Sequence, residues 1–64
     1  MKITKAILDD KIHKHEKGVT HNLTFRQYIR ELEDEFEIAN ADLDSMTDEE
    51  LNDYDEWLWE LSLK

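Results

Sequence analysis

The clearest pattern in the chain is a run of apolar residues after Thr24 that recurs at intervals of three and four. This spacing places the apolar side chains on one face of a helix. Thr24 and Gln27 have the spacing of a capping box, in which each side chain binds the other's backbone amide. The pattern predicts an amphipathic helix over residues 25–38, with an apolar face made of Phe25, Tyr28, Ile29, Leu32 and Phe36.

A second pattern of the same kind follows Thr47, which has Glu50 at the capping-box position. Acidic residues fill the first turn at 48–50, where the helix dipole favours negative charge. These features predict a helix over residues 48–63, antiparallel to the first across a short linker at 39–45. Its expected core face consists of Leu51, Tyr54, Trp57, Leu58 and Leu61.

The N-terminal third gives a weaker signal. Thr4 and Gly18 are suitable end residues for a helix over residues 5–17, which we favour. Ile3 and Ile7, however, lie away from the face that Leu8 would occupy on such a helix. The alternative is a short strand at 2–8 that pairs with residues 19–23. With the two clear helices, the patterns predict an all-α fold: a small antiparallel helical domain that spans residues 1–64.

Length and composition limit the class of protein. The chain has 64 residues, no cysteine, no proline and one glycine, so disulfides and cysteine-based metal sites are excluded. Because the chain has no proline and only one glycine, an all-β fold rich in tight turns is disfavoured. No apolar run approaches the roughly 20 residues of a membrane span, and the N-terminus lacks the apolar stretch of a signal peptide. We therefore expect a soluble cytoplasmic protein with no membrane partner.

Charge is distributed unevenly along the chain, whose net charge is −9. Residues 1–30 carry seven basic and three acidic side chains, a net of +4, whereas residues 31–64 carry fourteen acidic side chains and one basic one, a net of −13. The basic lead segment could contact phosphates weakly, but the acidic half would repel the same polyanion. We therefore expect no direct binding of nucleic acid, and we expect the basic segment to pack near the acidic half.

Residue types that carry catalysis or bind metals do not form a recognisable site. His13 and His15 point to different faces of a helix, and His21 lies beyond a turn. The aspartates between Asp42 and Asp48 do not match the ligand positions of a calcium loop. There is no glycine-rich phosphate loop, and a small helical domain offers little concavity to shift carboxylate pKa values. We expect no enzyme activity, metal or cofactor.

Trp59 and Leu63 are one helical turn apart and lie opposite the expected core face of the second helix. Two interpretations are open. The indole either packs beneath the N-terminal segment or serves as an exposed apolar anchor with an acidic rim for a partner.

Two acidic runs, at 31–37 and 48–56, dominate the second half of the chain. In size, acidity and lack of cysteine, the chain resembles the small DNA-mimicking inhibitors of phages and mobile elements. Anti-CRISPR proteins, anti-restriction proteins and uracil-DNA glycosylase inhibitors belong to this class. The resemblance covers mainly residues 31–64 and involves no family motif, so no functional residue is transferred. It implies helical carboxylates that occupy the basic groove of a nucleic-acid-binding protein.

We therefore expect a non-enzymatic, anti-CRISPR-like inhibitor that binds a basic nucleic-acid-binding protein, with a CRISPR effector nuclease as the first candidate. The alternative is a homo-oligomeric or regulatory protein-protein interaction module, in which Trp59 and Leu63 contact a second copy. The expected partner-binding residues are Glu33, Asp34, Glu37, Asp42, Asp44, Asp48, Glu49, Asp53, Glu56, Trp59, Glu60 and Leu63.

Overall fold

The computed structural model describes residues 2–63, in which two α-helices and three short 3₁₀ turns form a small all-α domain. The helices are α1 (Phe25–Glu35) and α2 (Asp48–Ser62). The 3₁₀ turns are η1 (Lys5–Ile7), η2 (Ile12–Lys14) and η3 (Leu43–Ser45). The predicted all-α class is confirmed, and no helix among the described residues is both long and apolar enough to cross a membrane.

Both helices begin at the predicted capping boxes. At α1 the Gln27 amide donates to Thr24 Oγ1 at 3.1 Å, and the Thr24 amide donates to Gln27 Oε1 at 2.9 Å. Thr47 and Glu50 make the equivalent pair at α2, at 3.2 and 2.9 Å. Because each box satisfies two amides that a helix leaves unpaired, the start of each helix follows from local sequence.

The α1 helix ends three residues before the predicted position because Glu37 adopts a left-handed conformation, with φ of 56°. The amide of Ile38 then donates to the Glu33 carbonyl at 2.8 Å, and the Glu37 amide donates to the Asp34 carbonyl at 3.2 Å. These two bonds are those of a Schellman motif, which usually has glycine at the left-handed position. The chain therefore leaves the helix at a residue that carries a backbone strain.

The N-terminal segment is not one continuous helix over residues 5–17, and it is not a strand at 2–8. Its backbone pairs instead with the chain just before α1: the Ile12 amide donates to the Leu23 carbonyl at 3.0 Å, and Lys11 and Thr24 form an isolated antiparallel bridge. Ile3 and Leu8 are both buried in the core, at 0% and 2% exposure. Ile3 precedes the η1 turn and Leu8 follows it, and this short turn lets both side chains reach the core.

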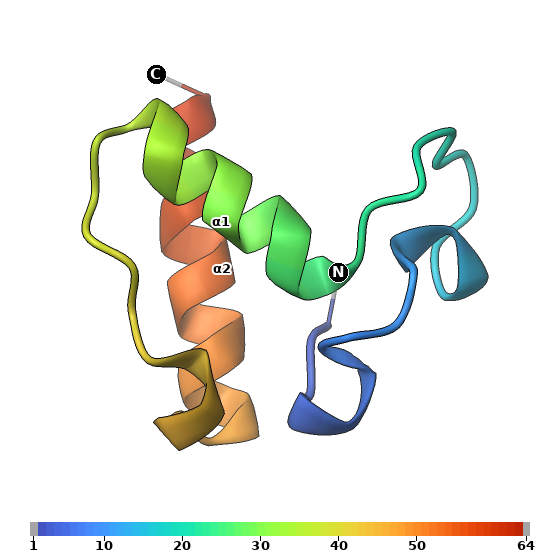
Figure 1. Cartoon of the computed structure of the whole chain (residues 1–64), viewed down its shortest axis with the longest axis horizontal. Helices are drawn as coiled ribbons and strands as arrows, with labels where there is room; N and C mark the ends of the chain where they lie inside the picture. Colours follow the sequence, from blue (N-terminus) through green and yellow to red (C-terminus); the bar gives the residue numbers. More distant parts are fainter. Residues whose placement is uncertain (1, 64) are drawn as a thin grey trace.

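The helices do not lie alongside one another as the predicted antiparallel pair. In Figure 1 α1 crosses α2 obliquely, and both helices run toward the same end of the molecule. The connection over residues 36–47 is longer than the predicted linker, and it returns along the outside to the end where α2 begins. Leu43 of η3 is fully buried and anchors this connection to the core.

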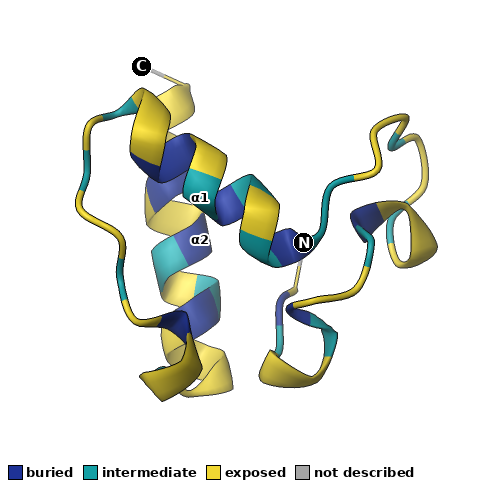
Figure 2. Cartoon of the chain, viewed as in Figure 1, coloured by how far each residue is buried: buried dark blue, intermediate teal, exposed yellow. Residues whose placement is uncertain are grey.

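The core forms where α1, α2 and the N-terminal turns meet, as the buried stretches in Figure 2 show. The predicted face of α1 is confirmed, since Phe25 and Ile29 are fully buried. The predicted face of α2 is wrong at Trp57, which is 46% exposed and stacks on Tyr54 with ring centroids 5.8 Å apart. The buried hydrophobic residues are Ile3, Leu8, Ile12, Phe25, Ile29, Leu32, Leu43, Leu51 and Leu58.

Candidate functional site

Four carboxylates form one row along the exposed side of α2. Glu49, Asp53, Glu56 and Glu60 follow one another at intervals of four, three and four residues, which keeps them on one helical face. All four are exposed, and none takes part in the ion pairs that residues 2–63 form. We call these four residues the carboxylate row.

The carboxylate row has a linear charge density lower than that of one nucleic-acid strand, but of the same order. At about 1.5 Å of rise per residue, the row covers about 17 Å of helix axis, with a charge every ~4.5 to 6 Å. One strand of B-DNA carries a phosphate per about 3.4 Å of axis. Like charges at these helical spacings repel, by roughly 0.2–0.5 kcal/mol per pair, so the repulsion within the row opposes folding.

The first half of the carboxylate row borders a shallow hollow. Lys2, Glu49, Asn52, Asp53 and Glu56 line it. Lys2 is exposed at this border, so one positive charge stands near three negative ones. The surface therefore keeps an excess of negative charge even where the basic lead segment meets α2.

Trp59 lies beside the second half of the row and is 48% exposed. It lines two hollows, one with Asp55, Glu56, Glu60 and Leu63 and the other mainly with the segment from Ile12 to Tyr28. The indole is thus neither fully packed beneath the N-terminal segment nor fully exposed. Leu63, its neighbour one turn on, is 66% exposed.

Asp55 is the residue of this site that the sequence reasoning missed. It is only 4% exposed, and its Oδ1 atom has no hydrogen-bond partner in the described part of the chain. Burial raises the pKa of this carboxyl group to about 6; the charge of the chain's α-amino group lowers it, and Glu56 raises it. The helical spacing from Leu51 and to Leu58 places Asp55 on the core face, which is the signal that could have found it.

Glu33, one of the expected partner-binding residues, does not belong to the surface, because it is fully buried. Its carboxylate accepts hydrogen bonds from Arg30 at 2.7 Å, from the Ala41 amide at 2.8 Å and from the Tyr54 hydroxyl. Burial acts to raise the pKa of Glu33, but these hydrogen bonds outweigh it and hold the pKa below its ordinary value. Burial, together with the hydrogen bond to Glu33, raises the pKa of the Tyr54 hydroxyl to about 12. Glu33 therefore ties α1, the connection and α2 together.

The remaining expected residues are exposed but do not belong to the carboxylate row: Asp34 lies on α1, Glu37, Asp42 and Asp44 lie in the connection, and Asp48 is the first residue of α2. Asp34 borders a different hollow, with Arg30, Glu31 and Asn40. Three of these carboxylates are engaged within the domain. Asp44 pairs with Arg26 at 2.7 Å, Asp42 accepts from the Ser45 hydroxyl at 2.7 Å, and Asp48 accepts from the Lys5 amide at 2.9 Å. Glu37 occupies the left-handed position that ends α1.

The arginines of the basic lead segment are used inside the domain. Arg26 joins Asp9 and Asp44, each at 2.7 Å, which raises its pKa, and Arg30 pairs with the buried Glu33. The structure thus agrees with the expectation that basic residues offset part of the acidic half. The carboxylate row on α2 lies outside these pairs.

Among residues 2–63, no group of three or more potential ligand side chains is arranged to hold a metal ion. The surface is instead one of negative charge beside a half-exposed indole. Comparison with known proteins adds no further assignment: no family model, no curated protein and no solved structure matches this chain.

Proposed function

We propose that this domain is a non-enzymatic inhibitor that binds the basic nucleic-acid groove of a target protein through α2. The observation that carries this proposal is the carboxylate row, Glu49, Asp53, Glu56 and Glu60, which is exposed beside Trp59 and Leu63. A row of like charges destabilises the helix that carries it. The repulsion within the row does not favour folding, whereas a partner with a basic groove would be attracted by the row.

Mimicry of nucleic acid is the form of binding that this geometry favours. The row presents a regular line of negative charges, more widely spaced than the phosphates of one DNA strand, on a helix that needs no ordering when it binds. Charge of this kind steers encounter and selects basic partners, while the apolar pair Trp59 and Leu63 supplies contact area. A CRISPR effector nuclease is the target class to test first, followed by restriction enzymes and DNA-repair glycosylases.

The proposal is tested by charge reversal in a competition assay. Nucleases from each class are mixed with the wild-type chain or with the double variant Asp53→Lys/Glu56→Lys, and DNA cleavage is measured. We expect the wild-type chain to inhibit at least one class and the variant to lose at least about tenfold in potency, because repulsion replaces attraction.

The matched control is Glu31→Lys/Glu35→Lys, which makes the same charge change at exposed positions on α1. It should keep its potency to within about threefold, and circular dichroism should show the same helix content in all three proteins. Equal loss in both variants would mean that net charge alone matters, and the proposed role of α2 would be wrong.

Light scattering distinguishes the homo-oligomeric alternative, in which the exposed Trp59 and Leu63 contact a second copy. An inhibitor that presents α2 to a target should be monomeric at micromolar concentration. A dimer that Trp59→Ala converts to a monomer would show that this face is used for self-association, and the proposal would fail.

A further inference from the structure

The hollow beside Trp59 contains a buried carboxylate with an unsatisfied oxygen. Asp55 is only 4% exposed, and its Oδ1 atom accepts no hydrogen bond within residues 2–63. Buried polar atoms are nearly always paired, because an unpaired one costs roughly 1–3 kcal/mol. An unpaired buried carboxylate at a surface hollow therefore indicates a group that a ligand completes.

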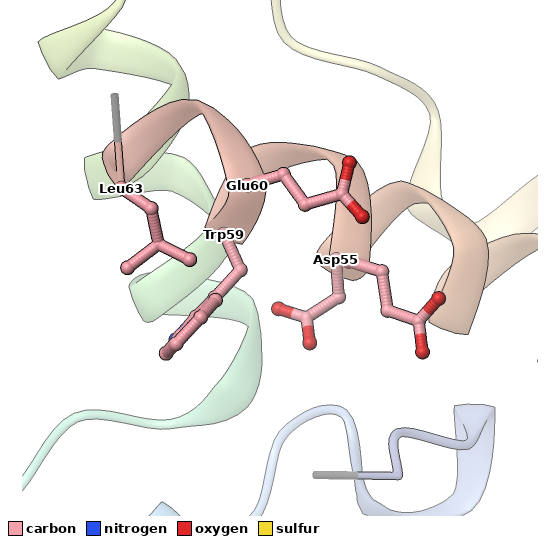
Figure 3. A pocket seen from close by; sticks show the side chains of 5 residues that line it. Asp55, Trp59, Glu60 and Leu63 are labelled. Atoms are coloured by element: carbon pink, nitrogen blue, oxygen red, sulfur yellow. The ribbon is translucent and has the colours of Figure 1, made fainter.

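The neighbours of Asp55 form a row suited to an extended cationic side chain. Asp55, Trp59 and Leu63 are spaced at four-residue intervals, and in Figure 3 all three project to the same side of α2. They line a hollow of about 450 Å³ together with Glu56 and Glu60. The row thus offers a carboxylate, an aromatic face and an aliphatic surface in succession.

The side-chain charges that line this hollow are negative, and the positive α-amino group of the chain also acts on Asp55. Its lining contains three carboxyl groups and no basic side chain. Tyr28 of α1 also stands near Asp55, whose charge acts together with burial to raise the pKa of the Tyr28 hydroxyl. A cation that entered here would relieve the repulsion between these groups and offset the incompletely paired charge of the Asp55 carboxylate.

We propose that the hollow formed by Asp55, Trp59 and Leu63 receives an arginine side chain of the partner protein. The guanidinium stacks on the Trp59 indole and donates to the Asp55 carboxylate, and the aliphatic stem of the arginine packs on Leu63. This inference rests on the proposed function, because it names the residue by which a basic partner is held.

Arginine suits this hollow better than lysine for two reasons. Its guanidinium is flat and can stack on an indole while its N–H groups point sideways toward a carboxylate. It is also less strongly hydrated than an ammonium group, so it loses less on entering a site whose floor is shielded from water. Arginines are common in grooves that bind phosphates, which is where the proposed mimic would dock.

The inference is tested with a peptide instead of a target protein. The isotopically labelled full chain is titrated with an acetylated and amidated tetra-arginine peptide at 150 mM salt, and the NMR signals of the Trp59 indole N–H and the Leu63 methyl groups are followed. The equally charged tetra-lysine peptide is the reference. We expect tetra-arginine to bind at least about fivefold more tightly and to shift both sets of signals.

Two variants separate the proposed site from diffuse attraction. Asp55→Asn and Trp59→Leu should each weaken binding of tetra-arginine by at least about fivefold, the latter read on the Leu63 methyl groups. Glu35→Gln removes one exposed charge from α1 and should change affinity by less than about twofold. If Asp55→Asn and Glu35→Gln weaken binding equally, or if tetra-lysine binds as tightly, the proposed arginine site is wrong.

This outcome is independent of the nuclease assay. Peptide binding at Asp55 without any inhibition would support the arginine site and leave the proposed function without support. Inhibition that depends on Asp53 and Glu56, with no effect of Asp55→Asn on peptide binding, would support the proposed function and show that the arginine site is wrong.

Discussion

Asp55 and Glu33 are two buried carboxylates with opposite environments. Glu33 accepts three hydrogen bonds, from Arg30, the Ala41 amide and Tyr54, whereas Asp55 has an oxygen with no partner in the described chain. The pKa of Glu33 is accordingly lowered and the pKa of Asp55 is raised. One carboxylate therefore stabilises the native state in its charged form, and the other destabilises it.

The raised pKa of Asp55 predicts how stability changes with pH. In the unfolded chain this group ionises near its ordinary pKa of 3.8, but in the folded chain it ionises near 6. The folded state therefore binds more protons between these values, and its contribution to stability falls as pH rises from about 4 to about 6. Asp55→Asn should raise the free energy of unfolding at pH 7.5 by roughly 2–3 kcal/mol, since one pKa unit corresponds to about 1.4 kcal/mol.

Urea unfolding of both proteins at pH 7.5 and at pH 3.5 measures this effect. The two proteins should differ little at pH 3.5, where Asp55 is largely protonated in both states. A variant that is less stable than wild type at pH 7.5 would show that the Asp55 charge is satisfied in the native state.

Glu33 should behave in the opposite way. Glu33→Gln removes the charge that Arg30 faces in the core, and we expect it to lower the free energy of unfolding by about 2–4 kcal/mol at pH 7. The control Glu35→Gln, an exposed position two residues away, should change it by less than about 0.5 kcal/mol. Chemical unfolding measures both, and equal small effects would mean that the network around Glu33 contributes little.

At the scale of the element, the carboxylates of α2 differ in their effect on helix stability. Glu49 lies in the first turn, where the helix dipole stabilises negative charge. Glu56 lies in the second half of the helix, where the dipole does not stabilise negative charge. It is three residues from Asp53 and four from Glu60, so it repels both. The same row therefore includes one charge that assists the helix and others that oppose it.

This difference gives a matched pair of substitutions. Glu56→Gln should raise the free energy of unfolding by about 0.5 kcal/mol at low salt, and less at high salt because ions screen the repulsion. Glu49→Gln should lower it by about 0.3–1 kcal/mol because it removes a charge from the first turn. Thermal melts at 20 mM and 500 mM salt measure both, and a stabilising effect of Glu49→Gln would contradict this account.

The end of α1 also has a cost that a single substitution should remove. Glu37 adopts φ of 56°, a conformation that costs a residue with a side chain about 1 kcal/mol or more. Glycine is the usual residue at this position of a Schellman motif. Glu37→Gly should therefore raise the melting temperature, whereas Glu31→Gly, in the middle of α1, should lower it.

At the scale of the whole molecule, side chains of α2 fix the N-terminal segment: Asp48 accepts from the Lys5 amide, and Asn52 pairs with both backbone groups of Ile3. Asn52 accepts from the Ile3 amide at 2.8 Å and donates to the Ile3 carbonyl at 2.7 Å, a contact that joins residues 49 positions apart. The Asn52 side chain thus makes the two backbone hydrogen bonds to Ile3 that a neighbouring β-strand would otherwise make. It also helps to bury Ile3, which is part of the core.

Asn52→Ala should release this segment. Two backbone groups lose their partner, so we expect a loss of about 1–3 kcal/mol in the free energy of unfolding and faster exchange of the Ile3 amide hydrogen. Asn40→Ala, at an exposed position in the connection, is the control and should leave both unchanged. Unchanged protection of Ile3 in Asn52→Ala would show that burial alone holds the segment.

The sequence by itself determined the local features of this protein. The two capping boxes and the apolar spacing of α1 depend on residues within one or two turns of each other, so the helix starts and the α1 face could be predicted. The uneven charge also follows from the sequence, and helical spacing places Leu63 opposite the expected core face of α2. The carboxylate row needs only the periodicity of α2, once that helix is recognised.

The tertiary structure decided everything that depends on contacts between distant residues. It placed Glu33 and Asp55 in the core, left Trp57 half exposed and Trp59 between two hollows, and crossed α1 over α2. It also broke the N-terminal segment into two turns, because Ile3, Leu8 and Ile12 all had to reach one small core. Helical spacing places Asp55 on the core face of α2, but it cannot foresee the other outcomes, since burial depends on which segments, far apart in the chain, cover a given face.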